Sequence, residues 1–520
     1  MSNFTIDDIL AGISDSLNKL QERKELASQP VEKTSNSSFS SESSATESPS
    51  KYTSEYYKSF AKEYIEFTYK NPTIYHVVEH FSSQLTDNGF TYISEKDNWT
   101  NLKPGKYFTT RNGSSLSAFY IGKDWTPEKG VGAIGSHIDS LTTVLKPNST
   151  KEKIDGYELL GVAPYAGTLG TLWLDRDLGI GGRLLIKDKD NKINQKLIDS
   201  TPNPIAHIPT LAPHFGEIAF QPINKETKSI PVIGFSQEPD PEPTEAEKNA
   251  PLYGKHSLKL LRYIAKLANV KVEQISQWDL QLYDVQKGSI GGLNEEFIFA
   301  PRVDDRICSF AGINALIEAS NENKLGSDSF SIVSLYDNEE IGSATRAGAK
   351  GGLFELVIER ILSTKYLNPN QLSIQDKLRQ TYANSIILSA DVIHLLNPNY
   401  QEAYLENHKP IPNKGISLTL DPNGNMATDS IGISLVEQLG KLNNDEIQYF
   451  QIRNDGRSGS TIGPSISSQT GARTIDLGIP QLSMHSIRAT VGSKDVGLGI
   501  KFFYGFFKSW RKTYDEYVDL

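Results

Sequence analysis

Apolar residues recur at helical spacing near the start of the chain and then almost disappear. The first pattern predicts an amphipathic helix of about five turns, formed around Ile6, Ile9, Leu10, Ile13, Leu17 and Leu20. Residues 28–50 are rich in Ser, Thr, Glu and Asn, so they bury too little apolar surface to fold and are expected to form a disordered linker. The helix within residues 1–27 is then expected to bind a partner's groove or to self-associate, the alternative being packing on its own domain.

From residue 51 onward the pattern is that of a folded α/β protein. Residues 56–69 and 75–85 have helical spacing, and residues 107–110, 117–121 and 130–137 have the apolar character of strands. Strands and helices alternate again over residues 296–300, 311–319, 330–336, 352–362, 385–388, 431–439, 448–452, 474–477 and 496–508. Such alternation predicts an α/β fold with a sheet covered by helices on both faces.

The middle of the chain differs from its flanks in composition and in hydrophobic pattern. Residues 151–284 contain many prolines and several short strand-like runs. We interpret this stretch as a β-rich domain inserted into one α/β domain, which would comprise residues 51–150 and 285–520.

Composition limits the classes of protein that remain. The chain has 520 residues, 38% of them hydrophobic and 22% charged, which is typical of a globular protein with room for two or more domains. No apolar run approaches the roughly 18 residues that span a bilayer, and no secretory signal core follows the start. The net charge of −10 argues against nonspecific nucleic-acid binding. The single cysteine, Cys308, excludes a disulfide framework and a multi-cysteine zinc site.

Two adjacent glutamates follow the buried-strand pattern of residues 330–336. Glu339 and Glu340 lie in the sequence DNEEI, and neighbouring residues of an extended chain point to opposite sides. Either the chain turns there or the two carboxylates have different tasks, such as a metal ligand beside a general base. The alternative for an isolated Glu-Glu pair is a solvated turn.

Further candidate ligands also lie where strands are predicted to end. They occur in residues 135–139 (GSHID), 301–306 (PRVDDR), 389–391 (SAD) and 482–486 (LSMHS). Singly, such residues are more often structural histidines or helix caps. In open α/β sheets, however, ligands bind where the carboxyl ends of strands converge. Histidine with aspartate and glutamate, and no cysteine, is a ligand set for one or two divalent ions.

Taken together, these motifs resemble those of a known protein family. In their order GSHID, PRVDDR, DNEEIGS, SADVIH and QLSMHSIR, the sequence resembles the aspartyl-aminopeptidase family of cocatalytic zinc aminopeptidases. Residues 174–178 (LDRDL), 407–410 (NHKP) and 459–464 (GSTIGP) agree with it. The resemblance runs from about residue 51 to the C-terminus. It implies a mixed-sheet zinc aminopeptidase domain with an inserted dimerisation domain, and two Zn²⁺ per subunit, with Mn²⁺ or Co²⁺ as alternatives.

The resemblance also implies a role for each site residue. Asp304 would bridge two ions, one held with His137 and Asp391 and the other with Glu340 and His485. Glu339 would be the general base that takes a proton from a metal-bound water and passes it to the leaving amine. Asp139 would orient His137. Relatives often have a cis peptide after the bridging aspartate, here between Asp304 and Asp305.

Substrate contacts are less defined. Members that prefer acidic residues resemble WHTWFDRDL around the DRDL motif, whereas this chain has no histidine in residues 170–178. The vacuolar branch of the family implies neutral or apolar, leucine-like N-terminal residues of short peptides. His394, Lys414 and His214 are candidate substrate contacts; a solvated lysine is the alternative for Lys414, and a structural role or a neighbouring subunit's site for His214.

The resemblance finally implies an assembly and a location. Subunits of the family build a closed dodecamer from dimers. The helix within residues 1–27 would be a propeptide that self-associates and binds a selective-autophagy receptor, which carries the proenzyme from cytoplasm to vacuole. Alternative functions are a related hydrolase with acidic preference or acting on other amides, and a non-catalytic cargo or scaffold particle.

Overall fold

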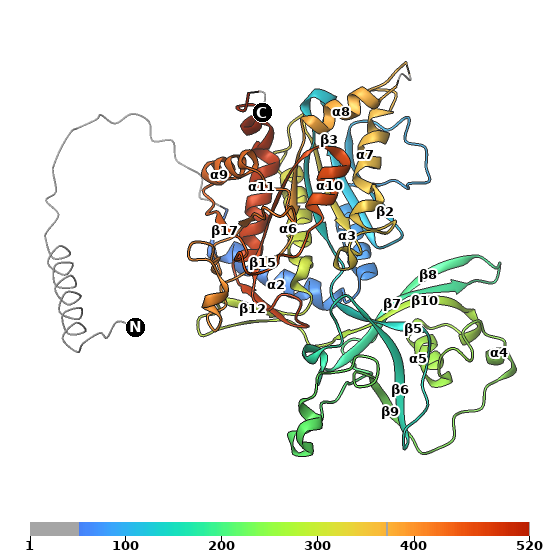
Figure 1. Ribbon diagram of the computed structural model, residues 1–520. Coiled ribbons are helices and arrows are strands. Elements are labelled where there is room, and N and C mark those ends of the chain that lie inside the picture. Colours follow the sequence, from blue (N-terminus) through green and yellow to red (C-terminus); the bar gives the residue numbers. More distant parts are fainter. Residues whose placement is uncertain (1–50, 371–372, 519–520) are drawn as a thin grey trace, which may run out of the picture. The chain divides into compact units, whose positions relative to one another are not determined.

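The computed structural model describes residues 51–370 and 373–518. The predicted propeptide helix and linker, residues 1–27 and 28–50, lie outside the described residues. Residues from Lys51 onward form one compact unit, which contains two large sheets (Figure 1).

The first large sheet has nine strands in the order β1-β2-β3-β13-β4-β14-β18-β16-β17. At its centre, β13, β4, β14 and β18 run parallel, whereas β2, β3 and β13 pair antiparallel. The strands are β1 (Thr91–Tyr92), β2 (Gly105–Arg111), β3 (Ser115–Ile121), β4 (Gly132–His137), β13 (Phe330–Tyr336), β14 (Ile386–Ala390), β16 (Ser417–Thr419), β17 (Gln448–Phe450) and β18 (Arg473–Gly478).

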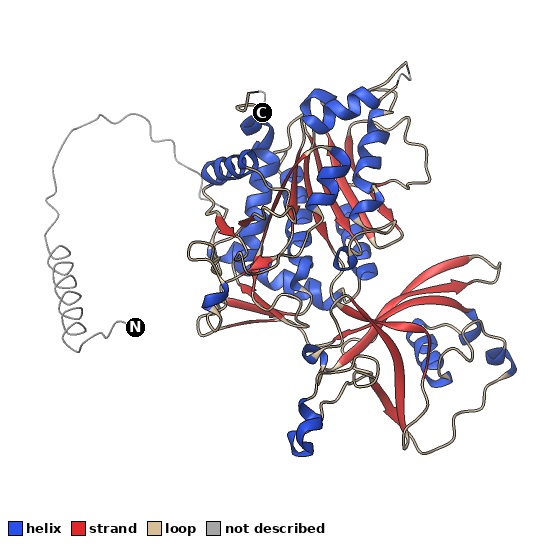
Figure 2. Cartoon of the chain, viewed as in Figure 1, coloured by secondary structure: helices blue, strands red, loops and turns tan. Residues whose placement is uncertain are grey.

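Helices cover both faces of this sheet (Figure 2). One core lies between the sheet and α2 (Ser54–Lys70), α3 (Ile74–Asp87), α6 (Val303–Asn321), α9 (Ser430–Asn443) and α11 (Asp495–Tyr514). Another lies between the opposite face and α7 (Leu353–Leu362), α8 (Gln375–Ala383) and α10 (Gly463–Thr470). Because both faces are covered, all seven residues of β13 are buried, which explains the continuous apolar run that predicted this strand.

The second large sheet is antiparallel and has the strand order β8-β7-β10-β5-β6-β9. Its strands are β5 (Thr142–Thr150), β6 (Tyr157–Tyr165), β7 (Leu178–Lys187), β8 (Ile193–Asp199), β9 (Val232–Phe235) and β10 (Ile275–Asp284). The amphipathic helix α5 (Leu258–Ala268) packs its apolar face on this sheet in a separate core, and α4 (Glu245–Lys248) lies nearby in sequence. The first strand of this sheet begins at Thr142. The boundaries of the inserted domain inferred from the sequence, residues 151–284, stay a prediction.

Two small sheets complete the architecture. One joins β11 (Ser289–Gly291), β12 (Phe297–Ala300) and β20 (Ala489–Gly492); the other pairs β15 (Ile393–His394) with β19 (Pro480–Gln481). Short 3₁₀ helices lie at η1 (Pro127–Lys129), η2 (Thr171–Trp173), η3 (Pro213–Phe220), η4 (Val272–Gln274), η5 (Glu339–Ile341), η6 (Ala349–Gly351) and η7 (Gln401–Ala403).

The predicted α/β class, with a mixed sheet between two helical layers, is confirmed. The sequence did not indicate α8, α10 or β16. The sequence of α8, QDKLRQTYA, is mostly polar, and β16 has only three residues, so neither offers a periodic apolar pattern long enough to recognise. Cys308 is fully buried in the core.

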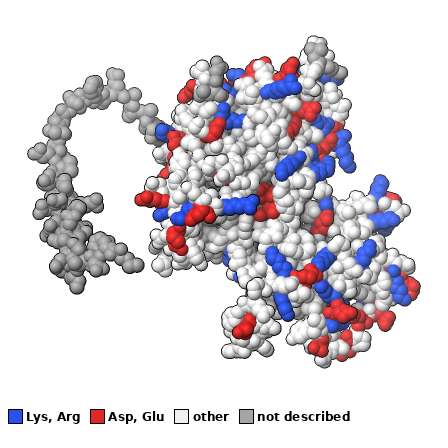
Figure 3. All heavy atoms as spheres, in the orientation of Figure 1, with Lys and Arg blue, Asp and Glu red and all other residues white. Residues whose placement is uncertain are grey.

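The surface carries both signs of charge. On the face shown in Figure 3, Lys and Arg are interspersed with Asp and Glu. Among the described helices, none is both long and apolar enough to cross a membrane.

Candidate metal centre

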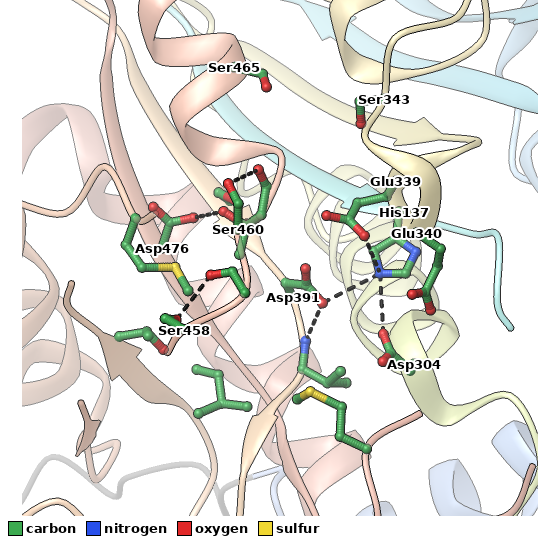
Figure 4. Close-up of a pocket in the computed structure, with 18 of the residues that line it drawn as sticks. His137, Asp304, Glu339, Glu340, Ser343, Asp391, Ser458, Ser460, Ser465 and Asp476 are labelled. Carbon is green, nitrogen blue, oxygen red and sulfur yellow. Dashed lines mark hydrogen bonds and ion pairs between the residues drawn. The ribbon is translucent and has the colours of Figure 1, made fainter. Parts of the chain in front are cut away.

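Three neighbouring parallel strands bring the predicted ligands to one edge of the sheet. β4 ends at His137 and β14 ends just before Asp391. β13 ends at Tyr336, and the DNEEI turn that follows it directly carries Glu339 and Glu340. Because β13, β4 and β14 are adjacent and parallel, their carboxyl ends meet, and the side chains that follow them converge (Figure 4).

Asp304 lies between the two histidines of the site. It stands at the beginning of α6, and its peptide bond to Asp305 is cis, as the resemblance implied. Asp304 Oδ1 is 3.2 Å from His137 Nε2, and Oδ2 is 3.6 Å from His485 Nε2. One carboxylate thus faces imidazoles that are separated by more than three hundred residues in the sequence.

Each imidazole also faces a further carboxylate. His137 Nε2 is 3.5 Å from Asp391 Oδ1 and 4.0 Å from Glu339 Oε2, and its side chain is only 2% exposed. His485 Nε2 is 3.6 Å from Glu340 Oε2, and the side chain of His485 is 58% exposed. Asp304 therefore lies between two histidines, and each of these histidines faces at least one further carboxylate.

A tight turn separates the two glutamates. Asn338 has a left-handed φ of 63°, and η5 follows at once. Asn338 tolerates this conformation better than most residues. The turn sends Glu339 towards His137 and Asp391 and Glu340 towards His485, which agrees with the expectation that the chain turns here.

Asp139 supports both the imidazole and this turn. The His137 ring nitrogen Nδ1 lies 3.0 Å from the backbone carbonyl of Asp139 and 3.3 Å from its Oδ1. The Asp139 carboxylate also accepts hydrogen bonds from the N–H groups of Glu339 and Glu340, at 3.1 Å each, and from the Tyr165 hydroxyl at 2.7 Å. Sequence reasoning found the first contact and missed the others, because Tyr165 lies on the second sheet.

The site concentrates negative charge away from water. Burial raises the pKa of Glu339 to about 8, and the nearby Asp391, Asp139 and Asp304 act in the same direction although His137 opposes them. Burial, followed by the Asp304 carboxylate, raises the pKa of Glu340 well above its ordinary value. Buried carboxylates of like charge repel each other unless a cation compensates them.

The donor set fits divalent cations. Ligand atoms of His137, Asp304 and Glu340 lie within 4.8 Å of one another, as do those of His137, Asp305 and Asp391. Glu340 Oε1 is buried and has no hydrogen-bond partner in the described part of the chain. Imidazole and carboxylate donors without cysteine suit Zn²⁺ and similar ions.

Asp305 is a further carboxylate beside the site to which the sequence gave no role. It is fully buried, and its Oδ2 accepts a 2.6 Å hydrogen bond from the Ser136 hydroxyl. Of these two aspartates, Asp304 is the one that faces both histidines.

A pocket of about 590 Å³ opens over the ligands. One part of its wall is apolar and is formed by Val392, Ile393, Met426, Phe450, Leu477 and Met484. His394 also lines the pocket, with its ring centroid 5.2 Å from that of Phe450. Burial, with a further contribution from His485, lowers the pKa of His394, so the ring is neutral near pH 7.

The other candidate substrate contacts lie elsewhere in this subunit. Lys414 does not line the pocket; its ammonium pairs with Glu446 Oε2 at 2.8 Å. His214 is exposed within η3 and is also absent from the pocket wall. Lys350 and Arg457 are cations that do line the pocket. Their sequence surroundings gave no signal for this, because their approach depends on loop conformation.

This fold and site together define a metallopeptidase-like α/β protein with carboxylate and imidazole ligands at the sheet edge. Residues 67–507 match the family described as aminopeptidase I zinc metalloprotease, M18. The chain belongs to the M18 family of zinc aminopeptidases.

Individual relatives agree with this assignment. Vacuolar aminopeptidase 1 of Saccharomyces cerevisiae is 59% identical over 472 residues, which cover 89% of this chain and 91% of the yeast protein. The crystal structure of prApe1 superposes with a TM-score of 0.85 at 60% identity, covering 88% of this chain and 96% of the other.

Two further solved structures describe assemblies. The S. cerevisiae mApe1 dodecamer has a TM-score of 0.80 at 56% identity, covering 89% of this chain and 100% of that chain. The structure of the Ape4 and Nbr1 complex has a TM-score of 0.83 at 35% identity, covering 89% of this chain and 88% of that chain. The predicted zinc-dependent aminopeptidase is confirmed, and the predicted vacuolar location agrees with the yeast relative.

Proposed function

We propose that the site binds two divalent ions that share Asp304. His137 and Asp391 would complete one ligand set, and Glu340 and His485 the other. The observation that carries this proposal is the position of Asp304, whose two oxygens face the two imidazoles separately. Bound there, Zn²⁺ ions polarise a carbonyl and lower the pKa of a water.

The chain's own residues would then handle the proton and the orientation. Glu339 is 87% covered on its side chain and faces the His137 and Asp391 side of the site. We assign it as the base that accepts a proton from the attacking water and returns it to the leaving amine. Asp139 would hold His137 in one tautomer, as carboxylates and carbonyls do for metal-binding histidines.

We infer that the enzyme removes neutral or apolar N-terminal residues from short peptides. The apolar wall around Met426, Phe450 and Ile393 supports this preference, since an aliphatic side chain gains free energy by leaving water there. Lys350 and Arg457 at the same pocket favour the alternative, an acidic N-terminal residue. Comparing kcat/KM for leucine, glutamate and lysine anilides decides between them: leucine should be cleaved fastest, and a glutamate preference would refute the assignment.

We further propose that subunits assemble into a dodecamer. An exposed apolar strip on and before η3 supports oligomerisation; Phe215 is 66% and Phe220 is 73% exposed, and Leu211 and Ile218 accompany them. The dodecamer reported for the yeast structure supports the number. Light scattering should give a mass near twelve times the 57.6 kDa chain. A monomeric mass that persists at micromolar concentration would overturn this proposal.

For the N-terminal segment we propose a targeting role. The apolar stripe in residues 1–27 is suited to a partner's groove, and the Ape4 and Nbr1 complex is a precedent for a similar protein that binds another protein. Removing residues 1–27 should leave peptide hydrolysis intact and keep the enzyme in the cytosol. Normal vacuolar delivery of the truncated chain, followed by microscopy of a fluorescent fusion, would contradict this role.

A further inference from the structure

A second, much smaller cavity adjoins the metal site. Its volume is about 30 Å³, and Asp304, Glu340 and His485 belong to its wall as well as to the wall of the large pocket. Its remaining wall includes Gln481 and Trp173. A polar cavity needs at least about 10–15 Å³ to hold a water molecule, so this one has room for one or two.

Gln481 is an unusual residue in this wall. It is 1% exposed, and neither its amide nitrogen nor its amide oxygen has a hydrogen-bond partner among the described residues. Its backbone is fixed, because β19 pairs with β15 and the Leu395 N–H donates to the Gln481 carbonyl at 2.9 Å. Leaving a buried amide without partners is costly, so such a group usually indicates a bound molecule.

Complementary unpaired atoms lie around the same cavity. Glu340 Oε1 is a buried acceptor without a partner, and Trp173 Nε1–H is a buried donor without one in the same described region. The backbone N–H of Glu340 is held by Asp139, but this contact does not involve the carboxylate of Glu340. A water that accepts from Trp173 Nε1–H and donates to Glu340 Oε1 and to the Gln481 oxygen would satisfy these three atoms, and a second water could accept from the Gln481 amide nitrogen.

We propose that Gln481 is a positioning residue for Glu340, acting through one or two waters bound in this cavity. The water would hold Glu340 Oε1 on the cavity side and so direct Oε2 towards His485, from which it lies 3.6 Å away. Trp173, which belongs to η2 in the segment before β7, would connect the second sheet to the metal site. This inference rests on the proposed ligand role of Glu340.

The test is the zinc affinity of Gln481→Met, a substitution that preserves length and removes both hydrogen-bonding atoms. Competition with a chromophoric chelator on the full chain should show zinc binding weakened by about 10–100-fold for one of the two ions, the range typical of residues that orient metal ligands. The thermal midpoint of the metal-free protein should change little, because methionine keeps the apolar stem and a similar volume in the wall of the cavity. The absorption bands of the Co²⁺-loaded protein should also shift.

Two companion variants sharpen the outcome. Trp173→Phe removes only the indole donor and should weaken zinc binding in the same direction but by less than Gln481→Met does. Gln401→Met, at an exposed glutamine of η7, should change nothing. If the zinc affinity of Gln481→Met is unchanged, whatever its metal-free midpoint, the inference is overturned and Gln481 has only a packing role.

A third variant separates this inference from the function on which it rests. Glu340→Gln should itself lose tight binding of one ion. If Glu340→Gln keeps normal affinity, the proposed ligand set is wrong. If only Gln481→Met keeps it, the ligand set stands and the positioning role alone is rejected.

Discussion

The carboxylate of Asp139 accepts a hydrogen bond from the backbone N–H of Glu339, with 3.1 Å between Oδ1 and N. The same side chain binds the N–H of Glu340 and the hydroxyl of Tyr165. Asp139 therefore fixes the turn that separates the two glutamates, in addition to contacting the His137 ring. A single substitution here should disturb the base and both ligand sets together.

Asp139→Asn should lower kcat/KM by about 10–100-fold. The amide NH₂ would face N–H donors that need an acceptor, so the turn would lose one of its supports. Tyr165→Phe removes the hydroxyl that donates to Asp139 and accepts from Asn338 Nδ2. Because the bond to Asp139 contributes about 1 kcal/mol, the variant should lose only about fivefold in kcat/KM. Steady-state kinetics check both, with Tyr157→Phe, at an exposed tyrosine of the same strand, as a control that should retain full activity. Equal losses in Tyr165→Phe and Asp139→Asn would argue against this division of roles.

Glu339→Gln should abolish most turnover and leave zinc binding intact. The amide preserves the shape of the side chain but cannot accept the proton, and general bases typically contribute 10²–10⁴-fold. Zinc content by atomic absorption, measured beside kcat, distinguishes a base from a ligand. Glu402→Gln, at an exposed glutamate of η7, is the matched control. Near-normal turnover in Glu339→Gln would disprove the assignment.

Asp304→Asn should weaken binding of both zinc ions, whereas His485→Ala should weaken only one. This contrast follows from geometry, because Asp304 faces both imidazoles and His485 faces only the Glu340 side. Titration calorimetry on metal-free protein gives the number of ions bound. The exposed Asp328→Asn should bind like the unmodified chain. A loss of one ion in both site variants would mean that Asp304 is not shared.

Met426→Arg should shift the preference of the pocket towards acidic residues. A cation in the apolar wall would pair with a substrate carboxylate and would disfavour an aliphatic side chain there. The ratio of kcat/KM for leucine over glutamate anilide should fall at least about tenfold, which corresponds to about 1.4 kcal/mol. Met426→Leu, which keeps the wall apolar at similar volume, should leave the ratio nearly unchanged. An unaltered ratio in Met426→Arg would place the specificity pocket elsewhere.

Acid stability should depend on His256. Its ring is buried, lies 4.4 Å from Trp278 between centroids, and is 2.8 Å from the Ser149 hydroxyl. Burial, with a smaller contribution from Lys255, lowers the pKa of His256 to about 4. The unfolded chain, with a pKa near 6.5, therefore takes up the proton first, and stability is lost as pH falls from about 6.5 towards 4.

The double variant His256→Phe with Ser149→Ala replaces both partners of this hydrogen bond. It should lose less stability than the unmodified chain as the pH falls. The free energy of unfolding of the unmodified chain should fall between pH 7 and pH 4.5 by up to about 2 kcal/mol more than that of the double variant. Denaturant unfolding followed by tryptophan fluorescence at the two pH values measures this difference. An equal fall in the free energy of unfolding of the two proteins would show that His256 does not contribute to the loss of stability in acid.

Local patterns accounted for most of the fold. The run FSIVSLY predicted β13 with the bounds that the structure has, since a strand covered on both faces must be apolar throughout. Helices α2 and α3 and strands β2 to β4 were likewise predicted within a few residues. The polar helix α8 and the three-residue strand β16 were missed because their stability comes from packing against neighbours rather than from their own periodicity.

By itself, the sequence determined which side chains could bind a metal ion and that they follow the ends of strands. That much is local, because a strand's apolar run and the residues that follow it are adjacent in the chain. The tertiary structure placed Asp304 between the two histidines. It alone decided that Tyr165 reaches Asp139 from another sheet and that Lys414 pairs with Glu446 away from the pocket. These relations depend on the order in which strands pair and on how two sheets meet, and no local spacing encodes either.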